Sequence, residues 1–368
     1  MSVIRELALT DFRCYHSIEI GLTPGITIIT GANGQGKTSL LEAVAWAASA
    51  KSFRGVPDAA LVRTGAESAI LRATVDTDGR AQLLEAEIRA AGRNRVRLNQ
   101  NPLQRTRDLL GLVRVTVFSP DDLRLVKEGP AGRRDYLDDL LVTIAPRYEA
   151  ARSDFEKVLR QRNALLRQRA RGPDGESTLD VFDDQLARAG GELVRGRLRL
   201  VERLTPEIRG AYEALAGEPT PVDAVYEAEW AEGTPPDDGL EELLRAALRE
   251  RRAAELDRGV TLVGPHRDEW RLRLDGLDAR HHASQGEQRT LALGLRLAGH
   301  RLCAEITGTE PVLLLDDVFS ELDPRRAGAL VAHLPAAQSL VTTASAEPAG
   351  LVAERRLRVH AGVVEDDT

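Results

Sequence analysis

Cysteine is scarce in this chain, and its scarcity excludes a fold held together by disulfide bonds. The 368 residues include two cysteines, Cys14 and Cys303, and we expect each to pack as a small buried hydrophobic side chain. The sequence also lacks long apolar runs, which excludes a membrane-spanning helix. The first residues, MSVIRELALTDFRCY, lack the apolar core of a signal peptide, so we expect a cytoplasmic protein.

Lysine is also scarce, since almost all of the basic residues are arginine. The planar guanidinium of arginine suits bidentate contacts with phosphate. The formal net charge of −7 excludes a protein that coats nucleic acid with its whole surface, although it leaves room for a local basic surface. The composition, 42% hydrophobic and 29% charged, is typical of a soluble globular protein, and the length favours two domains.

A phosphate-binding loop is the most specific feature of the N-terminal part. Residues 26–30, ITIIT, predict a buried strand, and SLLEAVAWAASA after the loop has the pattern of a helix. Between them, GANGQGKT fits G-x-x-x-x-G-K-[ST], in which backbone N–H groups point at phosphates, the lysine reaches the β- and γ-phosphates and the threonine ligates Mg²⁺. The residues predicted to bind ATP are Gly31, Ala32, Asn33, Gly34, Gln35, Gly36, Lys37, Thr38 and Ser39.

A second apolar strand, PVLLLDD at residues 311–317, supplies acidic partners for this loop. In proteins with a phosphate loop, an apolar strand beside the loop ends in an aspartate that holds Mg²⁺, and Asp316 has this place. Asp317 follows it, where a carboxylate can accept a proton from the attacking water. We therefore predict that Thr38 and Asp316 hold Mg²⁺ and that Asp317 and Lys37 are catalytic.

A second anion-binding turn is predicted at residues 284–289, SQGEQR, where a helix begins. The Ser284 hydroxyl, the Gly286 N–H and the helix dipole all favour an anion there. One loop is enough to hold the phosphates of one nucleotide, so the second turn suits the γ-phosphate of an ATP bound by another copy. The alternative is a helix that Ser284 merely caps. The residues predicted to contact the partner's ATP are Ser284, Gln285, Gly286, Glu287 and Gln288.

A helical insert separates these motifs. Apolar residues recur three or four apart from about Asp135 to Ala170 and from Leu179 to Leu215, with a break at 171–175, which predicts an antiparallel hairpin of two helices. Each helix is expected to have roughly 35 residues and a length of about 50 Å. A short helix is expected over 240–257, and strands are expected within 68–117 and over 259–263, 270–274 and 339–343.

The motif order GANGQGKT, SQGEQR, LLLDDVFSELD resembles that of an ABC-type ATPase head: Walker A, signature, Walker B and D-loop, the last with Ser320 and Asp323. The segments LALTDFRCY, KSFRG, TLVGPHRDEW and ASQGEQRTLALGLRLA resemble the RecF family of bacterial recombination mediators. The similarity runs from residue 5 to about residue 345. It implies an α/β fold, an ABC-type P-loop ATPase head assembled from both chain ends around a helical lobe. The expected boundaries are 1–118 and 259–368 for the head and 119–258 for the insert.

The resemblance also implies an SMC-like ATPase that binds DNA and uses ATP and Mg²⁺. Members of this family dimerise with ATP and act with the RecO and RecR proteins at single-strand gaps and stalled forks, where RecA is loaded. We therefore expect an ATP-induced head-to-tail dimer that clamps duplex DNA at junctions with single strands. We also expect a weak, DNA-stimulated ATPase whose hydrolysis releases the DNA, and a location at the nucleoid.

The sequence departs from the ABC pattern at three places. A glutamine usually follows a core strand, but VTVFSPDD offers Ser119, with Asp121 and Asp122 as candidates for coupling to Mg²⁺ through water. A histidine usually follows the strand after Walker B, and Thr343 is the nearest residue in SLVTTAS. Asp317 stands where a glutamate is usual. The shorter carboxylate and the missing histidine both predict slow hydrolysis.

Several arginines are candidates for contact with a ligand. Arg13 is a candidate for contact with the nucleotide, with a plain surface position as the alternative. Two groups are candidates for contact with DNA phosphates: one alternates along an expected strand, so its members share a face, and the other crowds the end of the helical hairpin. The alternative for both groups is a solvated face. These DNA candidates are Arg93, Arg95, Arg97, Arg160, Arg162, Arg167 and Arg169.

Two other functions fit part of the sequence. A nucleotide-binding subunit of an ABC transporter would carry the same motifs, but the helical insert and the lack of an LSGGQ string argue against it. A small-molecule kinase would use the phosphate loop, but it has no use for a signature motif. The segment GPHRD at 264–268 is expected to form a hydrogen-bonded turn, and we assign it no chemical role.

Overall fold

The structure, a computed structural model, describes residues 2–168, 173–233, 239–334, 337–344 and 347–367. The chain forms two compact units, each built from separate segments. Unit 1 contains residues 1–123, 211–218 and 292–368, and unit 2 contains residues 124–210 and 219–291. Residues 259–291, which the sequence assigns to the C-terminal half of the head, thus group with unit 2, because strand β10 in this segment pairs with strand β9.

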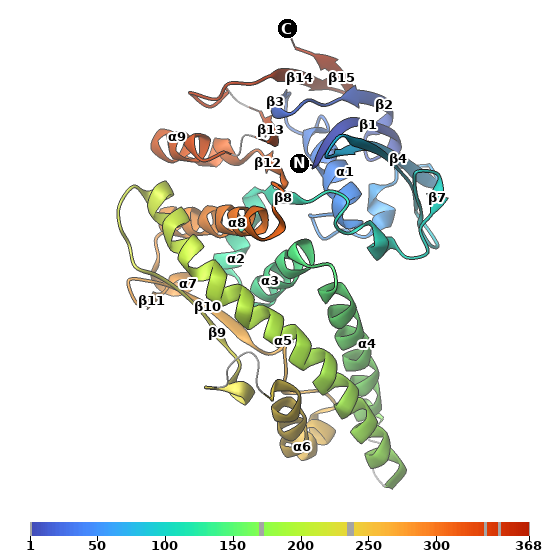
Figure 1. The fold of residues 1–368 in the computed structure, drawn as a ribbon, viewed down its shortest axis with the longest axis vertical. Coiled ribbons are helices and arrows are strands. Elements are labelled where there is room, and N and C mark those ends of the chain that lie inside the picture. The colour runs from blue at the N-terminus through green and yellow to red at the C-terminus, as the bar shows by residue number, and fades with distance from the viewer. Residues whose placement is uncertain (1, 169–172, 234–238, 335–336, 345–346, 368) are drawn as a thin grey trace. The chain divides into compact units, whose positions relative to one another are not determined.

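Unit 1 contains a mixed six-stranded sheet that carries both motif strands (Figure 1), in the order β15-β14-β3-β13-β12-β8. Five strands are parallel, and β15 pairs antiparallel with β14. Strands β12 and β13 are buried along their whole length, as is typical of parallel strands covered on both faces. The strands are β3 Gly25–Thr30, β8 Val115–Phe118, β12 Val312–Asp316, β13 Gln338–Thr343, β14 Arg355–His360 and β15 Val363–Asp366.

The second sheet of unit 1 is antiparallel, in the order β2-β1-β4-β5-β6-β7. Buried side chains alternate with more exposed ones along β4 and β5, because one face packs on the core and the other meets solvent. The strands are β1 Ser2–Phe12, β2 Tyr15–Gly21, β4 Ser68–Thr77, β5 Arg80–Arg89, β6 Arg95–Leu98 and β7 Asn101–Pro102.

Helix α1, Lys37–Ser49, contacts strands of both sheets. Its apolar side chains belong to a core cluster that includes side chains of both sheets, and Trp46 in the last turn of the helix is fully buried. The first residues of α1 are thereby held rigidly at the end of β3. Unit 1 also contains the helices η1 Asp58–Leu61, η2 Thr106–Leu109, η3 Pro120–Leu123, η5 Val318–Glu321 and α9 Pro324–Ala332.

Unit 2 is mainly helical and has a three-stranded sheet in the order β11-β10-β9. Helices α4 and α5 run side by side in opposite directions (Figure 1), which confirms the predicted antiparallel hairpin. The last residues of α5 and of α8 belong to unit 1. The elements are α2 Arg124–Lys127, α3 Pro130–Ile144, α4 Tyr148–Arg167, α5 Pro173–Ala216, β9 Val222–Glu227, η4 Glu229–Ala231, α6 Leu240–Arg258, β10 Glu269–Leu274, β11 Leu277–Asp278, α7 Ala279–His282 and α8 Gln285–Thr307.

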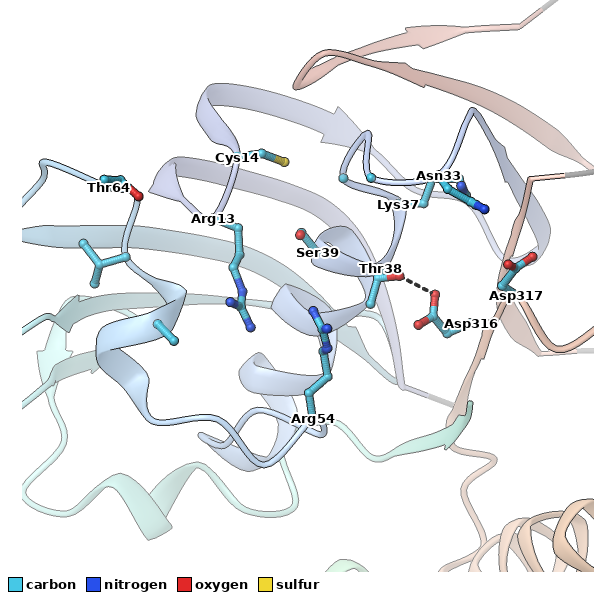
Figure 2. Close-up of a pocket in the computed structure, with 14 residues that line it drawn as sticks. Arg13, Cys14, Asn33, Lys37, Thr38, Ser39, Arg54, Thr64, Asp316 and Asp317 are labelled. Carbon is cyan, nitrogen blue, oxygen red and sulfur yellow. Dashed lines mark hydrogen bonds between the residues drawn. The ribbon is translucent and has the colours of Figure 1, made fainter. Parts of the chain in front are cut away.

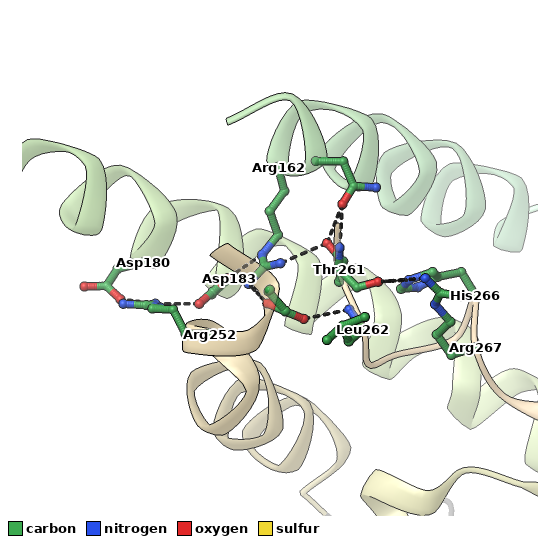
Figure 3. A network of polar contacts seen from close by, with 10 residues as sticks. Arg162, Asp180, Asp183, Arg252, Thr261, Leu262, His266 and Arg267 are labelled. Atoms are coloured by element: carbon green, nitrogen blue, oxygen red, sulfur yellow. Dashed lines mark hydrogen bonds and ion pairs between the residues drawn. The ribbon is translucent and has the colours of Figure 1, made fainter. Parts of the chain in front are cut away.

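A buried ion network joins α4, α5 and α6 to the segment that follows α6 (Figure 3). The Arg162 guanidinium donates to Asp183 Oδ1 and Glu255 Oε2, both at 2.7 Å, and to Thr261 Oγ1 at 2.9 Å. The side chain of Arg162 is fully buried, as is that of Glu255. The Leu262 N–H donates to Glu255 Oε1 at 2.7 Å, so the carboxylate also fixes the main chain of this segment.

Most of the expected elements of the head are confirmed: the strands at 26–30, 270–274, 311–317 and 339–343 and the helix after the phosphate loop. Two expectations in the insert are wrong. The first helix of the hairpin is interrupted between Ile144 and Tyr148, because Pro146 cannot donate a helical hydrogen bond, so α4 has 20 residues whereas α5 has 44. Residues 259–263 are not a strand, because Thr261 bonds to Asn163 and Arg162 and not to a neighbouring strand.

Candidate nucleotide-binding site

A cavity of about 530 Å³ lies in unit 1 where strand β3 leads into helix α1 (Figure 2). Its wall is mostly polar and brings together residues that are far apart in the sequence. Phosphate-loop residues form one part, and the aspartates that end β12 form another. The lining residues are Arg13, Cys14, Asn33, Gly34, Gly36, Lys37, Thr38, Ser39, Arg54, Ala60, Val62, Thr64, Asp316 and Asp317.

Two glycines allow the phosphate loop to fold closely against its neighbours. Gly36 has φ +121°, and a Cβ atom there would lie 2.6 Å from Tyr15 Oη and 2.7 Å from Cys14 Sγ. Gly31 has φ +148°, and a Cβ atom there would collide with the carbonyl oxygen of Val359 in β14. Any larger residue at either position would force the loop away from the strands that hold it.

Lys37 lies inside the loop and is 6% exposed. Its ammonium donates to the carbonyl oxygens of Gly31 at 2.8 Å and Ala32 at 3.0 Å. Burial lowers the pKa of the Lys37 ammonium, and the nearby charges of Asp317 and Asp316 partly offset this effect. A phosphate chain in the cavity would replace the two carbonyl oxygens as partners of this cation.

The loop and β12 meet through one carboxylate. Asp316 Oδ1 accepts a hydrogen bond from Thr38 Oγ1 at 2.8 Å (Figure 2) and another from Thr342 Oγ1 at 3.0 Å. Strand β13, which carries Thr342, lies between β3 and β12. The strand of Asp316 is therefore one strand further from the loop than the sequence pattern predicts. Burial raises the pKa of Asp316, although the two hydroxyl groups partly counter this effect.

Asp317 follows in a left-handed conformation, with φ 51°. Its N–H donates to Thr342 Oγ1 at 2.9 Å. Its Oδ1 is buried and accepts no hydrogen bond from the part of the chain that the structure describes. A buried carboxylate oxygen at the cavity wall is suited to accept a hydrogen bond from water or from a ligand. Thr342 thus orients both aspartates, although no motif in the sequence points to it.

Two arginines lie at the other side of the cavity. Arg13 forms a two-armed ion pair with the buried Glu42 of α1, with both N–O distances at 2.7 Å, so its position is set by the same helix that carries Lys37. Arg54, in KSFRG, lines the cavity too and was not predicted as a nucleotide contact. Cys14 is exposed at the cavity, so the expectation that it is buried is wrong, whereas Cys303 is buried as expected.

The predicted loop residues do not all face the cavity. Asn33, Gly34, Gly36, Lys37, Thr38 and Ser39 line it, whereas Gly31, Ala32 and Gln35 do not. The Gln35 side chain accepts the N–H of Ala361 at 2.6 Å, which ties the loop to the chain after β14. The roles of these residues toward ATP stay predictions.

The signature residues lie in unit 2, at the start of α8. The Ser284 N–H donates to Glu287 Oε2 at 2.7 Å and the Glu287 N–H donates to Ser284 Oγ at 3.3 Å, which is a capping box. Ser284 therefore caps the helix, and this role is compatible with contact to an anion. Gln288 is 5% exposed and donates to the carbonyl oxygens of Ala279 and Arg280, so its amide supports the turn before the helix, and its contact with the partner's ATP stays a prediction.

The remaining candidate residues of the head form hydrogen bonds with other residues of the chain. Ser320 Oγ donates to the carbonyl oxygen of Asp317 at 2.7 Å, and Asp323 caps α9 by accepting the N–H of Arg326. Asp122 is buried between the N–H of Ser119 and the guanidinium of Arg296, and its coupling to Mg²⁺ through water stays a prediction. Thr342, the residue before Thr343, contacts Asp316.

The arginines predicted to contact DNA include both exposed and buried side chains. Arg95 and Arg97 are exposed on one face of β6, as predicted, and Arg93 is exposed just before the strand. Arg160 and Arg167 are exposed on α4, and Arg169 lies outside the described residues. Arg162 is fully buried in the ion network of unit 2, so its assignment to a DNA-facing group is wrong.

The GPHRD segment forms the expected turn in unit 2. Asp268 accepts hydrogen bonds from Tyr226 Oη at 2.8 Å and from Trp230 Nε1 at 2.9 Å. Burial raises the pKa of Asp268 to about 6, although these hydrogen bonds counter the rise. His266 contacts the carbonyl oxygen of Thr261, and desolvation lowers its pKa to about 4. The segment therefore acts as a packed turn, and these contacts give it no chemical role.

Among the described residues, no helix is long and apolar enough to cross a membrane. No group of three or more His, Cys, Asp or Glu side chains there is placed to hold a metal ion.

The sequence matches the family described as RecF/RecN/SMC N terminal domain over residues 3–360. It is 46% identical to the DNA replication and repair protein RecF of Frankia alni, over 98% of each chain. It is 47% identical to the protein of the same name of Streptomyces avermitilis, over 98% of this chain and 99% of that one. The structure resembles that of the recombination mediator protein RecF-ATP in the RecFOR pathway, with a TM-score of 0.92 and 30% identity, over 100% of this chain and 98% of that one. These similarities confirm the predicted fold class, and they give no support to a transporter subunit.

Proposed function

The chain belongs to the RecF family, and on that premise we propose that it is an ATP-dependent DNA-binding protein of recombinational repair and replication-fork maintenance. The observation that carries the proposal is the hydrogen bond between Thr38 and Asp316. This bond brings the phosphate loop and the acidic end of β12 together at one cavity, beside Lys37 and Asp317. Such a cavity is suited to holding a nucleoside triphosphate and hydrolysing it.

The residues of the cavity fit a nucleotide that carries Mg²⁺. Thr38 and Asp316 offer a hydroxyl and a carboxylate oxygen, which are the ligand types that Mg²⁺ prefers, and phosphate oxygens and water would complete its shell. A bound Mg²⁺ would neutralise charge on the phosphates. Lys37 and the loop N–H groups bind the β- and γ-phosphates. Arg54 also lines the cavity and adds positive charge toward the phosphate chain.

In hydrolysis, we assign Asp317 to the attacking water. Asp317 lines the cavity and its Oδ1 is without a partner among the described residues, so the carboxylate is available to accept the proton of a water molecule there. Its left-handed backbone and the Thr342 hydrogen bond fix where the carboxylate points. Aspartate is one methylene shorter than the usual glutamate, which supports slow turnover and a switch function.

The signature turn gives ATP a second role, as the link between two copies. Ser284 and Gly286, at the N-terminus of the 23-residue helix α8, present a hydroxyl, an N–H and a helix dipole to an anion. We assign these groups to the γ-phosphate held by the partner copy, with Gln285 and Glu287 beside them. The dimer would clamp duplex DNA at junctions with single strands, act with RecO and RecR, and open after hydrolysis. DNA stimulation of the ATPase and a cytoplasmic, nucleoid-associated location are parts of the same proposal.

Light scattering with and without ATP and gapped duplex DNA tests this function. Wild type should gain the mass of a dimer with ATP. Lys37→Met should bind no ATP and stay monomeric, because the charge on the phosphates is lost. Ser284→Arg should bind ATP as wild type does but stay monomeric, because the long side chain blocks the signature turn.

The matched control is Ser17→Arg, which makes the same change at an exposed position of β2 and should dimerise normally. If Ser284→Arg dimerised as well as Ser17→Arg, the signature turn would be only a capped helix.

A further inference from the structure

A second cavity, of about 290 Å³, lies in unit 1 and shares no lining residue with the nucleotide cavity. The loop between β5 and β6 forms one wall, and the segment after β7 forms another. Asp58 of η1 completes it. The lining residues are Asp58, Arg89, Gly92, Arg93, Asn94, Val96, Leu103, Gln104 and Arg105.

Three arginines line this cavity, two from the β5–β6 hairpin and one from the segment after β7. Arg89 pairs with Glu87 at 2.9 Å. Arg93 and Arg105 are both exposed, and neither forms an ion pair with a carboxylate among the residues that the structure describes. Like charges that gather without counter-charges repel one another, and a bound anion would relieve this repulsion.

The one carboxylate among the lining residues is already engaged. Asp58 Oδ2 accepts the Asn94 amide at 2.6 Å, and Asp58 Oδ1 accepts Trp46 Nε1 at 3.3 Å. Asn94 Oδ1 in turn accepts the N–H of Arg89 at 3.0 Å. Asp58 therefore anchors the hairpin loop to helix α1, and it forms no ion pair with Arg93 or Arg105 among the described residues.

The size and lining of the cavity favour one class of anion. Val96 is buried and Leu103 half-buried, so the cavity offers apolar surface beside its cations. A sugar-phosphate unit combines a negative charge with an apolar ring face, and it suits both.

We propose that this cavity is a subsite for the DNA backbone, in which Arg93 and Arg105 bind one phosphate group. The proposal rests on the proposed function, since it assumes that the ATP-bound protein binds DNA. It goes further by placing a phosphate contact at the loop between β5 and β6 and at the segment after β7, on the antiparallel sheet.

The test uses Arg93→Glu and Arg105→Glu, with Arg80→Glu as the matched control. Arg80 is exposed at the opposite end of β5, about 30 Å away at the usual rise per residue, and its replacement changes the net charge equally. Binding of the ATP-loaded protein to a fluorescent gapped duplex is measured by anisotropy over a series of salt concentrations. Each of the two cavity variants should bind on the order of tenfold more weakly, with a salt slope smaller by roughly 0.9 for a lost phosphate contact.

Arg80→Glu should keep both the affinity and the salt slope of wild type, and all three variants should keep the ATP affinity and the melting temperature. Equal DNA binding by Arg93→Glu, Arg105→Glu and Arg80→Glu would overturn the subsite but leave the proposed function standing. Normal DNA binding by the cavity variants together with loss of RecR binding would assign the cavity to an acidic protein and overturn the subsite. Failure of wild type to bind the duplex would overturn both proposals.

Discussion

Thr342 is a single buried hydroxyl on which both aspartates of the candidate site depend. It donates to Asp316 Oδ1 and accepts the N–H of Asp317. Thr27, on the neighbouring strand β3, is equally buried, but its hydroxyl meets no partner among the described residues. The two threonines therefore differ in bonding and not in burial.

Thr342→Val should lower the free energy of unfolding by about 1–3 kcal/mol, because it leaves a buried N–H without an acceptor. ATP hydrolysis should fall too, since both carboxylates lose their orientation. Thr27→Val makes the same change in the same sheet and should be close to neutral. Urea unfolding and single-turnover hydrolysis measure the two effects, and an equal loss in both variants would show that the Thr342 hydrogen bonds are unimportant.

Asp316 and Asp317 are neighbours that should respond differently to the same change. Asp316→Asn should weaken the binding of Mg-ATP, because this carboxylate is the proposed metal ligand. Asp317→Asn should bind ATP and dimerise, yet hydrolyse on the order of 10² to 10⁴ times more slowly, because the proton acceptor is lost. The dimer should then persist and hold DNA longer.

Dimer lifetime after removal of free ATP is the sharper readout, because the wild-type turnover is itself expected to be slow. If the Asp317→Asn dimer dissociated as fast as wild type, Asp317 would not be the base. Glu321, in the helix that follows it, would be the next carboxylate to test.

At the scale of elements, the packing of α4, α5 and α6 depends on the buried Arg162. Its replacement by methionine leaves Glu255 buried without a cation and leaves Asp183 with Arg252 alone, which should lower the free energy of unfolding by about 3–5 kcal/mol. Arg160→Met, on the exposed side of the same helix, should change it by less than about 0.5 kcal/mol. Denaturant unfolding of the two variants makes the comparison, and equal stability would contradict the structural role of Arg162.

The sequence already contained a signal for the burial of Arg162. Phe155, Val158, Arg162 and Leu166 recur at helical spacing, and all four are buried. Arg162 thus belongs to this apolar stripe, whereas the exposed Arg160 and Arg167 do not. Its partners could not be predicted in the same way, because Asp183 and Glu255 approach it only once three helices have packed.

The phosphate loop, α1, β12 and β13 were predictable because each is a local pattern: an apolar run, a glycine turn or a helical repeat. Thr342 and Arg54 were not, because they reach the cavity from segments far along the chain. The order of the strands was not predictable either. The pattern places β12 beside the loop, whereas β13 lies between β3 and β12, since the pairing of parallel strands leaves no local mark in the sequence.

At the scale of the whole chain, β3 depends on strands that come last in the sequence. Its two neighbours in the sheet are β13 and β14. A chain that ends at residue 337 should therefore fail to bind ATP although residues 31–38 are intact. A chain that ends at residue 361 loses only the edge strand β15 and the residues after it, and it should keep nucleotide binding. Titration with a fluorescent ATP analogue compares them, and wild-type affinity in the shorter chain would contradict this dependence.

The same strand order has a consequence for synthesis on the ribosome. Strand β3 leaves the exit tunnel early, but its neighbours follow more than three hundred residues later. At a translation rate of about 5–20 residues per second, both edges of this apolar strand stay open for roughly 15–60 s. Open strand edges pair readily with other chains. The nascent protein should therefore need a chaperone on its N-terminal segment, and it should gain ATP binding only as the last tenth of the chain emerges.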